Sequence, residues 1–140
     1  MAFQGKWKHV NDDDQFDAFL DALGANALAK KVAKEIHPTF EYEKDGDTYI
    51  MRFVGFGGPT TRECKFKDGE EFDHPASIIA PGETRKVVAK ILSDTAVELK
   101  TTSGTPDISE VREVVGEGEM TNTITYGTVS CKRFFKKVTE

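Results

Sequence analysis

Two segments near the start of the chain have the hydrophobic spacing of amphipathic helices. In 14–23 the apolar side chains recur at i, i+3, i+4 and i+7, namely Phe16, Phe19, Leu20 and Leu23. A second helix is predicted over 26–35, with an apolar stripe of Leu28, Val32 and Ile36 and with Ala29 and Ala33 beside it. Pro38 disfavours helix at the preceding residue, so this helix ends before it. Gly24 separates the segments, and we predict a helix–turn–helix hairpin.

The rest of the chain alternates apolar and polar positions with the period of two that strands have. Residues 5–10 form the opening strand, and turn sequences such as Asp45-Gly46 and Asp68-Gly69 divide the remainder into short segments. About ten strands result, with connections short enough for antiparallel neighbours. Because so large a sheet tends to curl until its edges meet, we predict an all-β, ten-stranded antiparallel barrel with the helical pair after the first strand. A flat sheet with the helices on one face is the alternative.

The last predicted strand places a charged side chain among apolar ones. Within 129–137, Arg133 shares its face with Val129, Cys131 and Phe135, while Lys132 and Lys136 take the other face. Arg112 repeats the pattern less sharply, because its face carries Ile108, Glu110 and Val114. If these faces line a barrel interior, two guanidinium groups project into a mostly apolar space. An exposed position for Arg112 also stays open.

A buried guanidinium needs an anion, because it does not escape burial by losing its proton. An internal ion pair could come from Glu98, Glu110 or Glu113. A carboxylate brought in by a ligand is the other solution, since the guanidinium donors match its two oxygens. The residues by themselves leave both solutions open.

Length and composition describe one globular domain, residues 1–140. The chain is 38% hydrophobic and 31% charged, too apolar for disorder, and no apolar run reaches the roughly 18 residues of a membrane span. A net charge of −5 argues against nucleic acid as a partner. The first residues lack the apolar core of a secretion signal, and Cys64 and Cys131 make no disulfide framework. We expect a cytoplasmic monomer with reduced thiols.

The sequence contains no recognisable catalytic motif. A nucleophile elbow, a phosphate-binding loop and a dinucleotide fingerprint in its proper context are all missing. His9, His37 and His74 lack the spacing of metal ligands, so we expect neither metal nor cofactor. Neither Asp73-His74 as half of a dyad nor Cys131 as a nucleophile has an identifiable partner. We expect that the protein is not an enzyme.

Several short segments occur in a specific order and spacing. They are Phe3-Gln4-Gly5-Lys6-Trp7-Lys8, Phe16-Asp17-Ala18-Phe19-Leu20, Leu23-Gly24, Pro38, Phe66-Lys67-Asp68-Gly69-Glu70-Glu71-Phe72-Asp73, Arg85-Lys86-Val87, Val111-Arg112-Glu113 and Gly127-Thr128-Val129-Ser130-Cys131-Lys132-Arg133. In these segments the whole chain resembles the intracellular lipid-binding proteins, and among them the cytosolic fatty-acid-binding proteins.

The resemblance implies a calycin-like, up-and-down barrel in which the helix–turn–helix forms a lid over an enclosed ligand, between strands 1 and 2. It implies that Arg112 and Arg133 hold the carboxylate of an acidic lipid, directly or through water. We therefore expect a non-enzymatic intracellular carrier of a long-chain fatty acid. The alternatives are a binder of retinoic acid or another acidic lipid, and a peripheral membrane-associated adaptor with the same fold.

The expected pocket combines the lid with the inner faces of the strands. Its wall residues, which could equally be ordinary core, are Phe16, Phe19, Leu20, Ala33, Ile36, Pro38, Phe40, Met51, Phe53 and Ile124. Two residues after the second arginine the family usually has a tyrosine. Phe135 stands there in this chain, so one hydroxyl donor to the carboxylate is missing.

The portal of the expected barrel departs from the family in its loops. Additional residues occur around Gly57-Gly58-Pro59 and between Pro75 and Glu83. Ile78 and Ile79 in the second loop either touch a membrane or fold onto the barrel. The basic residues of the second helix either make transient contact with anionic membranes or form a solvated face; they are Lys30, Lys31 and Lys34.

Overall fold

The computed structural model describes residues 3–35, 37–54, 62–75, 84–103 and 107–138. Two helices in these ranges, α1 (Phe16–Ala22) and α2 (Ala27–Glu35), lie between the first two strands in the chain. The strands are β1 (Gly5–Asp12), β2 (Thr39–Asp45), β3 (Thr48–Val54), β4 (Arg62–Phe66), β5 (Glu71–Pro75), β6 (Thr84–Ser93), β7 (Ala96–Ser103), β8 (Ser109–Gly116), β9 (Glu119–Tyr126) and β10 (Val129–Lys137).

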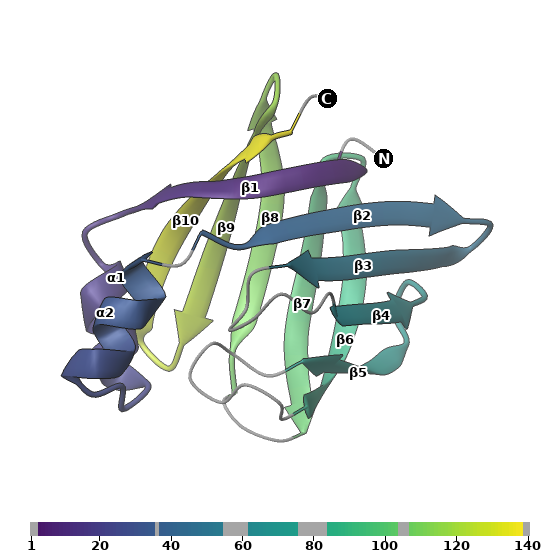
Figure 1. Cartoon of the computed structure of the whole chain (residues 1–140). Helices are drawn as coiled ribbons and strands as arrows, with labels where there is room; N and C mark the ends of the chain where they lie inside the picture. The colour runs from purple at the N-terminus through teal and green to yellow at the C-terminus, as the bar shows by residue number, and fades with distance from the viewer. Residues whose placement is uncertain (1–2, 36, 55–61, 76–83, 104–106, 139–140) are drawn as a thin grey trace.

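The strands form one antiparallel sheet in the order β4-β3-β2-β1-β10-β9-β8-β7-β6-β5. Consecutive strands pair with each other except β4 and β5, which form the two ends of the sheet and lie side by side in the described parts (Figure 1). The first strand closes the circle by pairing with the last, with Trp7 opposite Lys137. The prediction of a ten-stranded up-and-down barrel with a helical hairpin after strand one is confirmed, and the flat sheet is excluded.

The buried apolar side chains form two clusters. The larger cluster fills one part of the interior and includes Trp7, Phe40, Tyr42, Met51, Phe53, Leu99, Met120 and Phe135. The smaller cluster lies between the helices and the barrel, and consists of Phe16, Phe19, Leu20, Ala33, Ile108, Ile124 and Cys131. Since burying one large apolar side chain contributes about 1.5–3 kcal/mol, both clusters stabilise the closed barrel.

The first helix is shorter than predicted, spanning Phe16–Ala22 instead of 14–23. Asp13 forms a turn just before the helix, where its Oδ1 accepts a hydrogen bond of 3.0 Å from the backbone N–H of Gln15. The end of the helix follows from Gly24, which takes a φ of +84° that L side chains rarely adopt. The buried face agrees with the predicted one.

The second helix turns a different side to the barrel than its apolar stripe indicates. Leu28 and Val32 are 71% and 43% exposed, whereas Ala33 is fully buried. Ion pairs from Lys30 and Lys34 to Asp17 of α1 hold the small alanine side inward. Ile36, the third member of the stripe, lies outside the described residues, as do Ile78 and Ile79. Within the described ranges, no helix is long and apolar enough to cross a membrane.

Both cysteines are buried in the barrel wall and free. Burial raises the pKa of the Cys64 thiol and of the Cys131 thiol to about 12. Thiols with such high pKa values are poor nucleophiles at neutral pH.

Candidate ligand site

A row of polar side chains crosses three neighbouring strands on the inner side of the barrel. Arg112 on β8 stands directly opposite Asn122 on β9, and Asn122 stands directly opposite Arg133 on β10. All three are at most 4% exposed. The exposed alternative for Arg112 is therefore excluded, and both predicted arginines face the interior with an amide between them. Strands are about 5 Å apart, which separates the two arginine backbones by roughly 10 Å.

Arg112 is enclosed by aromatic side chains of β2 and by Met51 of β3. Its Nη1 donates to the hydroxyl of Tyr42, and its guanidinium lies 4.2 Å from the ring centroid of Phe40. Burial raises the pKa of Tyr42 to about 12 in spite of the nearby arginine charge, so the hydroxyl stays neutral. Cation–π contact and hydrogen bonding thus hold the side chain in a place where water cannot solvate it.

The carboxylate of Glu110 forms ion pairs with two buried guanidinium groups. Its Oε1 lies 3.4 Å from Nη2 of Arg112, and its Oε2 lies 3.3 Å from Nη2 of Arg85 on β6. Burial alone would raise the pKa of Glu110, but the charges of Arg112 and Arg85 outweigh burial and hold that pKa at about 2. Glu110 is therefore ionised at neutral pH, and these three side chains carry one net positive charge inside the barrel.

Arg133 has a different anion, Asp12 at the end of β1. Its Nε donates to Asp12 Oδ1 at 2.7 Å, and its guanidinium lies 4.6 Å from the ring centroid of Phe16 on α1. His9 Nε2 also lies 2.7 Å from Asp12 Oδ1. An ionised carboxylate only accepts hydrogen bonds, so this His9 nitrogen carries a proton and donates. Burial opposes ionisation of Asp12, yet the hydrogen bond from His9 and the charge of Arg133 lower its pKa.

A bulge in β1 explains why Asp12 was missed as a partner. The pairing with β10 shifts between His9 and Asn11, which places Asp12 opposite Arg133. Strict alternation from Trp7 and His9 puts Asp12 on the outer face, whereas the extra residue turns it inward. Sequence reasoning therefore did not name Asp12 as a partner of Arg133. Asp12 and His9 also line a groove of about 460 Å³ between β1 and the helices.

The other residues predicted for the ligand pocket are buried where they fall in the described ranges. Phe135 lies in the larger cluster with Phe40, and the two ring centroids are 5.0 Å apart. The predicted wall residues in the two clusters and beside them are Phe16, Phe19, Leu20, Ala33, Pro38, Phe40, Met51, Phe53 and Ile124. Of the arginine partners proposed from sequence, Glu110 is the one that contacts Arg112.

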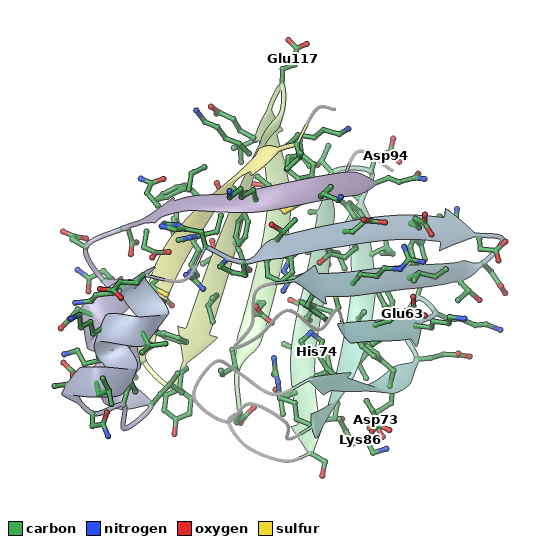
Figure 2. All side chains as sticks on the ribbon, in the orientation of Figure 1. Glu63, Asp73, His74, Lys86, Asp94 and Glu117 are labelled. Carbon is green, nitrogen blue, oxygen red and sulfur yellow. The ribbon has the colours of Figure 1, made fainter. Side chains whose placement is uncertain are left out.

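Asp73 and His74 lie on opposite faces of β5 and cannot act as a pair. Figure 2 shows both residues, with Asp73 at the outer surface beside Lys86, where Asp73 Oδ1 lies 2.6 Å from Nζ. His74 is buried in the interior, and its ring centroid is 5.2 Å from that of Phe53. In the described part of the chain, no group of three or more acidic, histidine or cysteine side chains could hold a metal ion.

Comparison with known proteins covers nearly the whole chain. No family model matches it. A fatty acid-binding protein of Lepidoglyphus destructor is 36% identical over 133 residues, which are 95% of this chain and 95% of that protein. The chain belongs to the fatty-acid-binding protein family. A second member, the fatty acid-binding protein of Tyrophagus putrescentiae, is 33% identical over 138 residues and 98% of each chain.

Other members of the fatty-acid-binding protein family share this fold. Cellular retinoic acid-binding protein 2 of Homo sapiens is 31% identical over 138 residues, which are 95% of this chain and 96% of that one. The solved structure of a Schistosoma mansoni fatty acid binding protein in complex with arachidonic acid has a TM-score of 0.83, at 30% identity. That likeness covers 99% of this chain and 97% of the solved one.

Proposed function

We propose that the protein is a non-enzymatic, cytoplasmic carrier of a long-chain fatty acid, which it holds inside the barrel with the carboxylate near Arg112 and Arg133. The observation that carries this proposal is the charge at Glu110. One carboxylate faces two buried guanidinium groups, so these three side chains leave one positive charge unbalanced. A buried cation without a partner costs several kcal/mol, and a ligand carboxylate would remove that cost.

Arg133 has a smaller role in this proposal than Arg112. Its pair with Asp12 is already balanced one to one, so a ligand carboxylate at Arg133 would have to compete with Asp12. A carboxylate at Arg112 gains from the unbalanced charge there, and it is also attracted by Arg133 on the far side of Asn122 without breaking that pair. Phe135 adds only apolar contact, since it has no hydroxyl to donate.

The apolar clusters supply the energy for binding the acyl chain. Burying a tail of ~14 methylene groups contributes roughly 11 kcal/mol at about 0.8 kcal/mol each. Loss of rigid-body and chain freedom opposes binding by about 4–15 kcal/mol. The tail therefore provides affinity, while the arginines select an ionised headgroup.

Replacing Arg112 with glutamine tests the charge argument directly. We expect Arg112→Gln to weaken binding of oleate by about 10- to 100-fold in titration calorimetry, because a hydrogen bond to a charged group contributes about 1.5–3 kcal/mol. Arg52→Gln is the matched control, since Arg52 pairs with Glu41 and Glu63 on the outer surface. Oleate affinity that is the same in both variants, with both folded by circular dichroism, would contradict the proposal.

A binder of retinoic acid is the second candidate, favoured by the human relative named for that ligand. Competition between oleate and retinoic acid for the purified protein separates the two. Preferential binding of retinoic acid, and its recovery by mass spectrometry of the lipid extracted from the expressed protein, would support this candidate.

We also propose that the carrier acts as a monomer and meets anionic membranes transiently through α2. Lys30 and Lys34 form ion pairs with Asp17, which neutralise part of their charge. Lys31 is exposed and lies on the same side of the helix as the exposed Leu28 and Val32. One cation flanked by two apolar side chains is the composition of a small membrane-contact surface.

A further inference from the structure

We propose that the preferred ligand is a fatty acid with a hydroxyl group on carbon 2 or carbon 3, bound by Asn122 and Arg112. This inference rests on the proposed function and names the class of fatty acid that the same site selects. It comes from the row of polar residues on β8, β9 and β10, where two buried atoms are left without a partner among the described residues.

The orientation of the Asn122 amide is determined by Glu110. Asn122 Nδ2 lies 3.1 Å from Oε1 of Glu110. Glu110 is ionised and only accepts hydrogen bonds, so the amide nitrogen, not the oxygen, must face it. Asn122 Oδ1 therefore points away from Glu110, and it has no hydrogen-bond partner in the described parts of the protein although Asn122 is only 2% exposed.

A donor without a partner stands on the neighbouring strand. Arg112 Nε is also buried and has no partner in the described ranges, while the remaining guanidinium nitrogens bind Tyr42 and Glu110. Arg112 and Asn122 are directly opposite each other, which places their side chains next to each other on the inner face. The pair thus presents one acceptor and one donor to the interior.

A hydroxyl group fits this pair, and a carboxylate does not. A hydroxyl oxygen accepts from Arg112 Nε while its proton goes to Asn122 Oδ1. A carboxylate at the same place would satisfy Arg112 but would repel the amide oxygen, because it has no proton to donate. An amide N–H on a ligand would satisfy Asn122 alone. A group that both donates and accepts is required.

The spacing of the row limits where that hydroxyl stands on the ligand. The excess positive charge that attracts the carboxylate is shared by Arg112 and Arg85, and Asn122 is one strand away from Arg112. Neighbouring strands are about 5 Å apart, so the hydroxyl must lie within that distance of the carboxylate. Carbons 2 and 3 of an acyl chain meet this condition, and a hydroxyl at the far end of the tail does not.

The test compares palmitic acid with its 2-hydroxy, 3-hydroxy and 16-hydroxy derivatives on the wild-type protein. We expect one of the first two to bind about 3- to 10-fold tighter than palmitic acid, the range that one net hydrogen bond gives. The 16-hydroxy acid should bind no tighter than palmitic acid. Equal affinity for all four acids would overturn the inference, and it is the result expected if ordered water occupies the pair.

Two variants on β9 test whether the side-chain amide of Asn122 causes the preference for a hydroxy acid. Asn122→Leu should abolish the preference, measured as the ratio of the affinity for the hydroxy acid to that for palmitic acid. Met120→Leu is the matched control on the same strand and inner face, and it should keep the preference. A preference that survives in Asn122→Leu would overturn the assignment. If that variant does not fold, the wild-type series still decides the question.

The same titrations keep the two proposals separate. Palmitic acid that binds with no preference for any hydroxy acid leaves the carrier function standing and removes this inference. Failure of palmitic acid and of all its hydroxy derivatives to bind removes the proposed function itself.

Discussion

Glu110 is the residue that makes a charged barrel interior stable without a ligand. Two guanidinium groups share it, and Asn122 supplies a further hydrogen bond to it. Because the arginines hold its pKa at about 2 in the folded protein, folding favours the ionised form over the protonated one. A group with a depressed pKa stabilises the fold above its unfolded pKa and loses that contribution as the pH falls.

We predict that the contribution of Glu110 disappears in acid. Its ordinary pKa is 4.5 and its folded pKa is about 2, so the loss takes place as the pH falls through this window. At pH 7 Glu110→Gln should lower the free energy of unfolding by on the order of 3 kcal/mol, measured by urea denaturation. The difference from wild type should shrink toward zero near pH 2. A difference that is the same at pH 7 and pH 2.5 would contradict this account.

At the same scale, strand alternation predicts some site residues and misses others for identifiable reasons. It places Arg112 and Arg133 inside because each shares its parity with apolar neighbours, and it names Glu110 as a candidate partner. Asn122 is not identified from the sequence, because a single uncharged amide in a strand does not require a counter-ion when it is buried. Asp12 is not identified either, because a one-residue bulge in β1 reverses the parity, and such a bulge leaves no clear mark in the sequence.

Among the elements, α2 shows how ion pairs can override hydrophobic spacing. Its apolar stripe predicts a buried face, but Leu28 and Val32 are exposed. The lysines bind the acidic side of α1, with Lys30 Nζ 2.9 Å from Asp17 and 2.8 Å from Asp21. The small side chain of Ala33 then fits beneath the lid. Spacing identified the helix correctly, but the contacts made by its partner helix decide which side is buried.

We predict that the exposed side of α2 serves transfer to membranes and not stability. Replacing Leu28 and Val32 together with serine should change the free energy of unfolding by about 1 kcal/mol or less, since Leu28 is 71% and Val32 43% exposed. The same variant should slow transfer of a fluorescent fatty acid to anionic vesicles by several-fold.

Lysine variants distinguish charge from apolar contact in that transfer. Lys31→Gln should remove much of the salt dependence of the rate, because Lys31 is exposed on the same side as the apolar pair. Lys30→Gln is the comparison, since Lys30 forms ion pairs with Asp17 and Asp21 of the neighbouring helix α1. Unchanged rates in the serine variant and in Lys31→Gln would argue against membrane contact through α2.

On the scale of the whole molecule, the described strands close the barrel by hydrogen-bonded pairing at every neighbouring pair except β4 and β5. The backbones of β4 and β5 lie side by side at the two ends of the sheet, while every other neighbouring pair is hydrogen-bonded (Figure 1). This is a seam at which the described strands separate without breaking a ladder of backbone hydrogen bonds. The amides that point into the seam have no strand partner to protect them.

We predict that hydrogen exchange locates the seam. Among strand amides, those of β4 and β5 should exchange fastest and those of β9 and β10 slowest, measured by two-dimensional NMR after transfer to deuterated buffer. Exchange in β4 and β5 as slow as in β9 would mean that the two edges pair in solution.

The architecture as a whole was accessible from the sequence, because turns such as Asp45-Gly46 divide the chain at regular intervals and the strands between them alternate. The order of strands follows from connections too short for any but neighbouring antiparallel pairs. The closing pair, β1 with β10, involves no short connection. Only the need to pair the backbone N–H and C=O groups of both edge strands predicts it. The missing ladder between β4 and β5 has no signature in either strand.

The pairing of β1 with β10 also bears on how the protein is made. Lys137, the strand partner of Trp7, is synthesised 130 positions later in the chain. At usual synthesis rates of ~5–20 residues per second, the first strand waits on the order of ten seconds. During that wait the apolar face of α1 is uncovered as well, since part of its cover comes from Cys131 on β10. The barrel therefore closes only after β10 has been synthesised, and until then the N-terminal half is the part that a chaperone has most to protect.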